Sequence, residues 1–113
     1  MAGAYGDGVL DELLLCMEIR RTREFLEWVT ELRDREAQAR ILIRIDRLAN
    51  GNPGQTRSVG SGVVEMKIDY GPGYRVYFIQ RGTSIVLLLC GGDKSSQDSD
   101  IRKAKTLAEA QEA

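Results

Sequence analysis

The residues best suited to chemistry lie between Gly60 and Gln97, in a chain of 113 residues that contains no histidine. Lys67, Arg75 and Lys94 fall on or beside neighbouring predicted strands. Tyr77 follows Arg75 at a spacing of two residues. Fixed cations and a phenol without an imidazole suit the binding and strain of a phosphodiester. They do not suit metal or serine-triad chemistry, in which histidine is the usual ligand or base.

Strand periodicity is expected to bring two of these cations together. Lys67 alternates with apolar residues, so its side chain points to the opposite face of a strand from theirs. Gly71-Pro72-Gly73 predicts a tight turn after this strand. Pairing in register across the turn would let Lys67 and Arg75 share one anion, with Tyr77 one cross-strand step along the same face. Glu65 also shares that face and fits an ion-pair partner of Lys67.

A glycine-rich turn, Gly91-Gly92-Asp93-Lys94, leads from an apolar strand into a predicted helix. Backbone N–H groups, the positive end of the helix and Lys94 would favour a phosphate there. Arg57, in a predicted flexible loop, would close over such a ligand. The alternative is that Gly91 and Gly92 serve the shape of the turn alone.

Arg40, Arg44 and Arg47 form a basic stripe at positions i, i+4 and i+7 of a predicted helix. The stripe is either the solvated side of an amphipathic helix or an RNA-binding surface. All 16 basic residues lie between residues 19 and 105, whereas six of the 17 acidic residues lie outside that range. A basic body between acidic ends is compatible with RNA or with an acidic partner.

Hydrophobic spacing predicts the elements that must position these residues. Residues 13–20 fit a buried strand. Two helices follow, on the apolar positions Phe25, Trp28, Val29 and Leu32, and then Ala37, Ile41, Ile45 and Leu48. Thr22 is the expected N-cap of the first helix, and Asn50-Gly51 ends the second. The short joint between the helices predicts an antiparallel helical hairpin.

The second half of the chain predicts strands. Residues 52–62 fit a loop, and residues 63–70, 74–81 and 85–90 fit strands, of which the last is apolar on both faces, as in a central strand. Ser95 or Ser96 would cap a final helix. The order β-α-α-β-β-β-α predicts an α+β fold, with the helical hairpin and the C-terminal helix against a small, mainly antiparallel sheet. Residues 13–113 are expected to form this single domain, and residues 1–12 a disordered tail.

Composition places the chain among globular proteins, with 42% hydrophobic and 29% charged residues. The longest apolar run, Ile85–Cys90, is too short to cross a bilayer, and residues 3–12 do not resemble a signal peptide. No membrane association is expected, and the cytoplasm is the default location. Cys16 and Cys90 are expected to be reduced core thiols, and neither has the neighbours that a metal site needs.

Five segments of the chain resemble the RelE/HigB superfamily of type II toxin–antitoxin toxins, in its addiction module killer protein branch. They are EIRRT (18–22), ARILIRIDRLANGNPG (39–54), VGSGVVEMKI (59–68), YGPGYRVYF (70–78) and LLCGGDKSSQ (88–97). Together they span most of the chain from Met17 to Leu107. Family chains begin near the position of Met17, so residues 1–16 are expected to be an extension or an upstream start.

The resemblance implies a RelE-like fold and an endoribonuclease that cuts mRNA on the translating ribosome, which inhibits translation. A cognate helix-turn-helix antitoxin would hold it inactive. Cleavage would need neither metal nor cofactor, because the ribose 2′-OH attacks the neighbouring phosphate and leaves a 2′,3′-cyclic phosphate and a 5′-OH. By position in the motifs, Lys67 would activate the hydroxyl or hold the phosphate. Arg75 and Lys94 would stabilise the developing charge.

The chain also departs from the family pattern. Related toxins carry a tyrosine or a histidine shortly after the basic residue that Lys94 matches, and residues 95–101 contain neither. Tyr77 would then supply a phenol from the adjacent strand. Lysine ordinarily titrates near about 10.4, so Lys67 would need neighbouring cations to act as a base. Two other functions remain open: a ParE-like interaction toxin that poisons DNA gyrase, and an inactive member that only binds its antitoxin.

Overall fold

The computed structural model describes residues 16–112, so the predicted tail over residues 1–12 lies outside the described residues. The strands are β1 (Glu18–Arg21), β2 (Thr56–Gly60), β3 (Val63–Ile68), β4 (Tyr74–Arg81) and β5 (Ile85–Gly92). The helices are α2 (Arg23–Thr30), α3 (Arg35–Ala49) and α4 (Gln97–Glu112), with the short 3-10 helix η1 (Lys94–Ser96) before α4. None of these helices has the length and apolar character of a membrane span.

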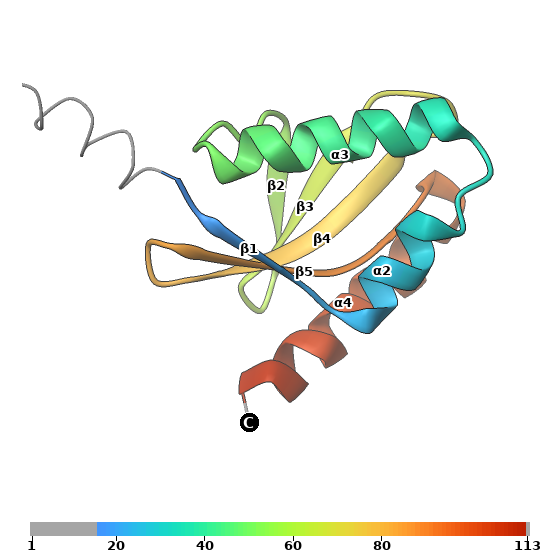
Figure 1. Ribbon diagram of the computed structural model, residues 1–113. Coiled ribbons are helices and arrows are strands. Elements are labelled where there is room, and N and C mark those ends of the chain that lie inside the picture. The colour runs from blue at the N-terminus through green and yellow to red at the C-terminus, as the bar shows by residue number, and fades with distance from the viewer. Residues whose placement is uncertain (1–15, 113) are drawn as a thin grey trace, which may run out of the picture.

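The five strands form one sheet in the order β1-β5-β4-β3-β2 (Figure 1). β1 runs parallel to β5, and every other neighbouring pair is antiparallel. The predicted α+β class, with a mainly antiparallel sheet and a C-terminal helix, is confirmed. β5 lies inside the sheet and is buried along nearly all its length, as its apolar sequence predicts.

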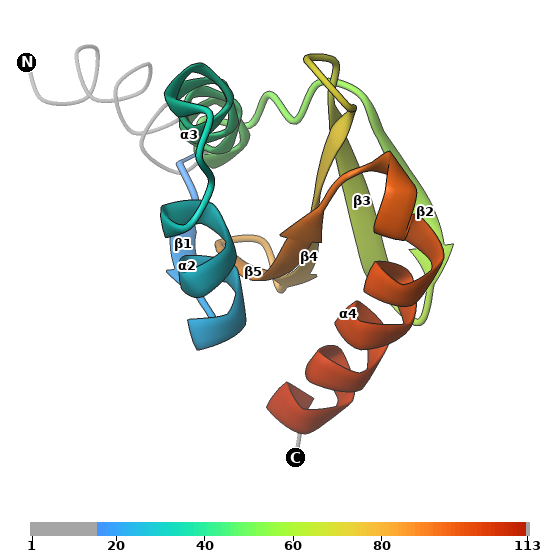
Figure 2. The same cartoon turned by 90° about the vertical axis from the view of Figure 1, so that its right-hand side faces the viewer.

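Helices cover both faces of the sheet, with α2 and α3 on one side and α4 on the other (Figure 2). The two-residue period of the strands divides their side chains between two cores. Met66, Val76 and Leu88 pack against α2 and α3. Tyr77 and Leu89 pack on the α4 side. The same alternation therefore determines the face of the sheet on which each polar strand residue lies.

Side-chain caps fix where the first two helices begin. The Thr22 hydroxyl accepts a hydrogen bond from the N–H of Phe25 and donates one to the carbonyl of Leu89, which confirms the predicted cap and ties it to β5. Asp34 caps α3. α2 packs against β5, whereas α3 packs against β3. The two helices therefore cover different parts of the sheet and do not pack as the expected antiparallel pair (Figure 1).

The prediction of a loop over residues 52–62 is wrong for its second half, where β2 forms. β2 is exposed along most of its length and pairs with β3 in the register Thr56↔Met66 and Arg57↔Glu65. This edge strand is held by its backbone hydrogen bonds to β3. Its sequence does not alternate between apolar and polar residues, so the pattern that predicts the other strands does not detect it. Arg57 therefore lies on the sheet and not in a flexible loop.

Three smaller predictions also need correction. β1 begins at Glu18 and is mostly exposed, because it is an edge strand held by its pairing with β5; residues 13–15 lie outside the described part. Asp93, not Ser95 or Ser96, caps the segment that leads into α4, because its carboxylate accepts the N–H of Ser95. Cys90 is buried as predicted, but Cys16 is exposed. Burial raises the pKa of the Cys90 thiol to about 12.

Candidate functional site

A cleft of about 240 Å³ lies where β2, β3, β4 and the first turn of α4 meet. Its lining residues are Gln55, Thr56, Arg57, Glu65, Lys67, Arg75 and Gln97. Three of these are cations and one is a carboxylate, so the cleft carries an excess of positive charge. Such a surface attracts anions such as phosphates.

Lys67 and Arg75 are direct partners across β3 and β4. The turn that joins these strands is closed by a hydrogen bond of 3.0 Å from the N–H of Gly73 to the carbonyl of Tyr70. The expected in-register pairing is therefore confirmed. Both side chains leave the sheet on the same face and line the same cleft.

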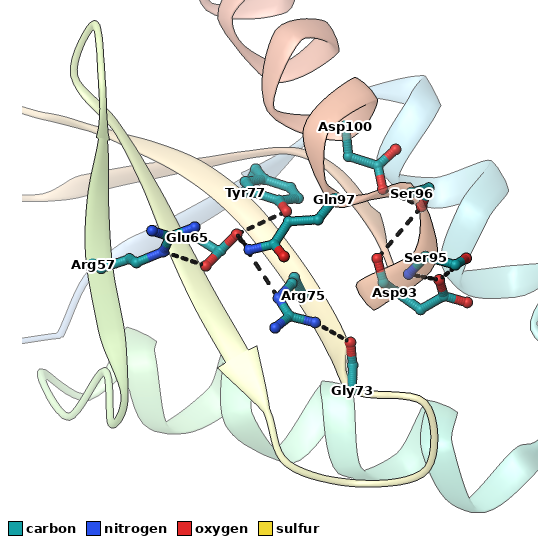
Figure 3. Close-up of polar contacts among 10 residues, drawn as sticks. All are labelled: Arg57, Glu65, Gly73, Arg75, Tyr77, Asp93, Ser95, Ser96, Gln97 and Asp100. Atoms are coloured by element: carbon teal, nitrogen blue, oxygen red, sulfur yellow. Dashed lines mark hydrogen bonds and ion pairs between the residues drawn. The ribbon is translucent and has the colours of Figure 1, made fainter.

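Glu65 is the centre of the polar contacts in the cleft (Figure 3). Its side chain is 4% exposed, and its Oε1 accepts a hydrogen bond of 2.8 Å from Nε of Arg57 on β2. Its Oε2 accepts one from the Tyr77 hydroxyl on β4 and one from Nε2 of Gln97 on α4, each of 2.9 Å. Burial pushes the pKa of Glu65 upward, but these hydrogen bonds outweigh it, so the pKa lies below its ordinary value. Glu65 is therefore a carboxylate that holds three elements together.

Arg75 has a buried donor that is not used. The residue is 7% exposed, and its Nη1 donates a 2.7 Å hydrogen bond to the carbonyl of Gly73. Its Nε lies 3.9 Å from Oε2 of Glu65, which is beyond hydrogen-bond distance, and has no hydrogen-bond partner among the described residues. A buried N–H without an acceptor is costly. This nitrogen is enclosed by the protein and faces Glu65, so a ligand in the cleft does not reach it in this conformation.

Tyr77 does not line the cleft, and its predicted catalytic role needs correction. The residue is fully buried, and its hydroxyl donates to Glu65. Burial and this hydrogen bond raise the pKa of Tyr77 far above its ordinary value. Tyr77 is therefore connected to the cleft only through its hydrogen bond to Glu65, which lines it.

Lys94 does not line the cleft, although it lies near Arg75, since a Cβ atom on Gly73 would be 3.2 Å from Nη1 of Arg75 and 3.9 Å from Cβ of Lys94. It is the first residue of η1 and lines a second hollow, with Ser95, Asp98 and Arg102 among its neighbours. Gln97 lines both hollows. Lys67 and Arg75 therefore line one cleft, as expected from the hairpin, whereas Lys94 lines the neighbouring hollow.

Gly91 and Gly92 are buried, and both are required by packing. A Cβ atom on Gly91 would overlap the ring of Trp28, which packs against β5 from α2. A Cβ atom on Gly92 would overlap the carboxylate of Asp100 on α4. Both glycines end strand β5, and the close approach of neighbouring side chains explains them without a bound phosphate.

The three arginines of α3 lie on the opposite side of the sheet from α4, and each has its own surroundings. Arg40 forms an ion pair of 2.9 Å with Glu36, and its guanidinium lies 4.5 Å from the centre of the Tyr70 ring. Arg44 donates hydrogen bonds to two backbone carbonyls. Arg47 lies in the last turn of α3. All three line a separate hollow of about 450 Å³, so they do not extend the cleft.

Four cleft residues were not predicted as functional: Gln55, Thr56, Glu65 and Gln97. Glu65 was interpreted only as an ion-pair partner of Lys67, and Gln97 was not singled out. The register supplies the missing signal, because Glu65 is paired with Arg57 on one side and with Tyr77 on the other. That signal depends on β2, which the sequence pattern does not indicate.

Comparisons with known proteins find sequence matches over most of the chain. The family model described as "Phage derived protein Gp49-like" matches residues 27–111, a range that contains every residue lining the cleft. An uncharacterized protein of Haemophilus influenzae (strain ATCC 51907 / DSM 11121 / KW20 / Rd) is 46% identical over 95 residues, which are 84% of this chain and 96% of that protein. No solved structure matches the chain.

Proposed function

The chain belongs to the Gp49-like family of phage-derived proteins, and we propose that it is the toxin of a type II toxin–antitoxin system. Family membership suggests a toxin of this kind. The RelE/HigB-like segments of the sequence and the α+β fold support a finer proposal. In it, the protein is an endoribonuclease that cuts mRNA on the ribosome, and a cognate antitoxin neutralises it.

The observation that carries this proposal is the pairing of Lys67 with Arg75 at one cleft. The two cations lie opposite each other on adjacent strands, and both side chains line the same cleft. A phosphodiester in the cleft would contact both cations. Positive charge fixed in this way stabilises the additional negative charge of a pentavalent phosphate.

The residues divide the work of the proposed reaction. The 2′-OH of one nucleotide attacks the adjacent phosphate and gives its proton to water. The bond to the next 5′-oxygen breaks, and that oxygen takes a proton from water, so no proton is gained or lost overall. Lys67 and Arg75 hold the phosphate and stabilise its charge. Glu65 accepts three hydrogen bonds and has a lowered pKa, so it is a weak proton acceptor. Its role is to hold Arg57 and Gln97 at the cleft.

Cleavage of a defined mRNA on purified ribosomes tests the proposal. The wild-type protein should produce fragments with 5′-OH ends, and Lys67→Ala and Arg75→Ala should reduce the rate by about 100-fold or more. Arg81→Ala is the matched control, because Arg81 is an exposed cation at the far end of β4 and should be dispensable. An intact message with folded wild-type protein would contradict the proposal.

A second candidate, a member that binds its antitoxin without cutting RNA, is favoured by one observation. The cleft contains no histidine, and the phenol of Tyr77 is buried beneath Glu65. Expression without antitoxin separates the candidates. Intact mRNA and normal growth would favour the inactive binder, whereas intact mRNA with DNA damage would favour a gyrase poison.

A further inference from the structure

Arg44 connects α3 to two segments that build the cleft. Its Nη1 donates a 2.7 Å hydrogen bond to the carbonyl oxygen of Lys67, near the end of β3. Its Nη2 donates a 2.9 Å hydrogen bond to the carbonyl oxygen of Pro53, in the loop before β2. One guanidinium therefore fixes the distance between this loop and the strand that carries Lys67.

The backbone of Lys67 is held from a second direction as well. Its N–H donates a 3.1 Å hydrogen bond to the carbonyl of Gln55. Gln55 and Thr56 line the cleft beside Lys67. Arg44 thus braces a closed unit that consists of the loop, the start of β2 and the end of β3.

Gly54 provides the space that the Arg44 guanidinium occupies. Its φ of +70° is a backbone conformation that favours glycine. A Cβ atom at this position would lie 2.6 Å from Nη2 of Arg44 and 3.0 Å from its Cζ. The end of a long side chain moves more easily than backbone, so a side chain at residue 54 would displace the guanidinium.

The contacts of Arg44 differ from both roles that the sequence analysis left open for it, a solvated cation and an RNA-binding cation. Both terminal nitrogens already donate to backbone oxygens. The planar fork of arginine can reach two carbonyls in fixed directions, whereas lysine offers a single flexible ammonium group. Burial, together with the nearby charge of Arg47, lowers the pKa of Arg44, which agrees with a guanidinium withdrawn from solvent.

We propose that Arg44 is a positioning residue, which sets the place of Lys67 in the cleft through the backbone of β3. The inference rests on the proposed function, in which Lys67 holds the scissile phosphate. Loss of the brace should move Lys67 relative to Arg75 and lower the cleavage rate by about 10- to 100-fold, as expected for a small misplacement of a reacting centre. A positive charge at residue 44 is not sufficient for this role, because two N–H groups must point at the carbonyl oxygens of Lys67 and Pro53.

The test compares Arg44→Lys, Arg44→Gln and Gly54→Ala with the control Arg47→Gln. Arg47 lies one turn further along the same helix and has no hydrogen bond to β3 among the described residues. Amide hydrogen exchange at Lys67 should accelerate at least tenfold in the first three variants under conditions in which core amides of β5 stay protected. Ribosomal mRNA cleavage should fall in the same three variants and stay near wild type in the control.

RNA affinity as a function of salt separates positioning from direct contact. A residue that neutralises an RNA phosphate lowers the slope of log affinity against log salt by about 0.7 when it is removed. We expect the slope to be unchanged in Arg44→Gln. Wild-type activity in Arg44→Lys, with a lowered slope in Arg44→Gln, would overturn the proposal in favour of RNA contact.

Two further outcomes keep the inference separate from the proposed function. Wild-type protein that never cleaves mRNA contradicts the proposed function, whereas exchange at Lys67 still decides whether Arg44 braces β3. In all three variants, amide exchange at Lys67 could instead accelerate only as much as exchange of the β5 core amides does. That result would overturn the positioning role and would show that Arg44 contributes only to the stability of the whole fold.

Discussion

The hydroxyl of Tyr77 donates a 2.9 Å hydrogen bond to Oε2 of Glu65, and both side chains are almost entirely enclosed by the protein. This contact joins the interior of β4 to the carboxylate at the base of the cleft. It explains how a charged residue is kept in the sheet, because a buried carboxylate requires hydrogen-bond donors. It also makes Tyr77 important for the cleft without bringing it to a ligand.

Tyr77→Phe should destabilise the protein by about 1–3 kcal/mol, because Glu65 loses one of its three hydrogen-bond donors while it stays buried. Urea denaturation monitored by circular dichroism measures the free energy of unfolding. Tyr74→Phe is the matched control, because Tyr74 lies on the same strand and its hydroxyl has no hydrogen bond among the described residues. Equal losses in the two variants would refute the importance of the Tyr77 contact.

The lowered pKa of Glu65 predicts a specific loss of stability in acid. A carboxyl group with a lower pKa in the folded state than in the unfolded state stabilises the fold above the unfolded value, here about 4.5. This stabilisation should disappear as the pH falls from that value through the lower pKa of the folded protein. Urea midpoints measured between pH 6 and pH 2, an interval of about 4 units that brackets the ordinary range for Glu, test the expectation.

Variants of acidic residues identify the source of that acid sensitivity. Glu65→Gln should be less stable at neutral pH, and its stability should depend less on pH below 4.5 than that of the wild type. Glu109→Gln, which replaces an exposed carboxylate on α4, should retain the wild-type profile. Parallel wild-type and Glu65→Gln profiles would show that another group causes the acid sensitivity. Asp93 is the next candidate, since hydrogen bonds from Ser95 lower its pKa.

Gly91→Ala should destabilise the fold by about 1–3 kcal/mol, because the added methyl group overlaps the ring of Trp28. A double-mutant cycle with Trp28→Leu tests the contact, since the smaller side chain leaves room for the methyl group. The second substitution should therefore recover part of the stability that Gly91→Ala loses. Fully additive effects on the free energy of unfolding would disagree with this account of the glycine.

Arg75→Lys should impair cleavage although it keeps the positive charge. The lysine would lose the hydrogen bond to the carbonyl of Gly73 and the planar fork of donors that can hold a phosphate in a fixed direction. We expect the cleavage rate to fall by about 100-fold, with little change in the salt dependence of RNA affinity. A rate within a factor of about two of the wild type would mean that charge alone is sufficient at residue 75.

The sequence predicts the core of the fold better than the cleft, for physical reasons. Met66, Val76 and Ile41 recur at strand or helix spacing, and burial of apolar area selects such patterns directly. β2 has no such pattern, because an edge strand is stabilised by backbone hydrogen bonds that any residue can make. Once β2 is missed, Arg57 is assigned to a loop, and the contact that explains Glu65 cannot be inferred.

The predicted cations also show that local relations can be predicted from sequence more reliably than contacts between distant segments. Lys67 and Arg75 were placed correctly because their relation depends on one hairpin that is local in sequence. Lys94 was not, because its direction depends on the 3-10 turn between β5 and α4. Arg44 was interpreted through its charge, whereas its role follows from two carbonyl groups that belong to other segments.

The position of Gln97 in the sequence affects when the cleft can form during synthesis of the chain. Glu65 receives its third donor from the first residue of α4, the last helix of the fold to leave the ribosome. A nascent chain that has already paired β2, β3 and β4 still lacks one wall of the hollow. The wall of the cleft that Gln97 supplies is therefore added only after the strands that carry Lys67 and Arg75 have been made.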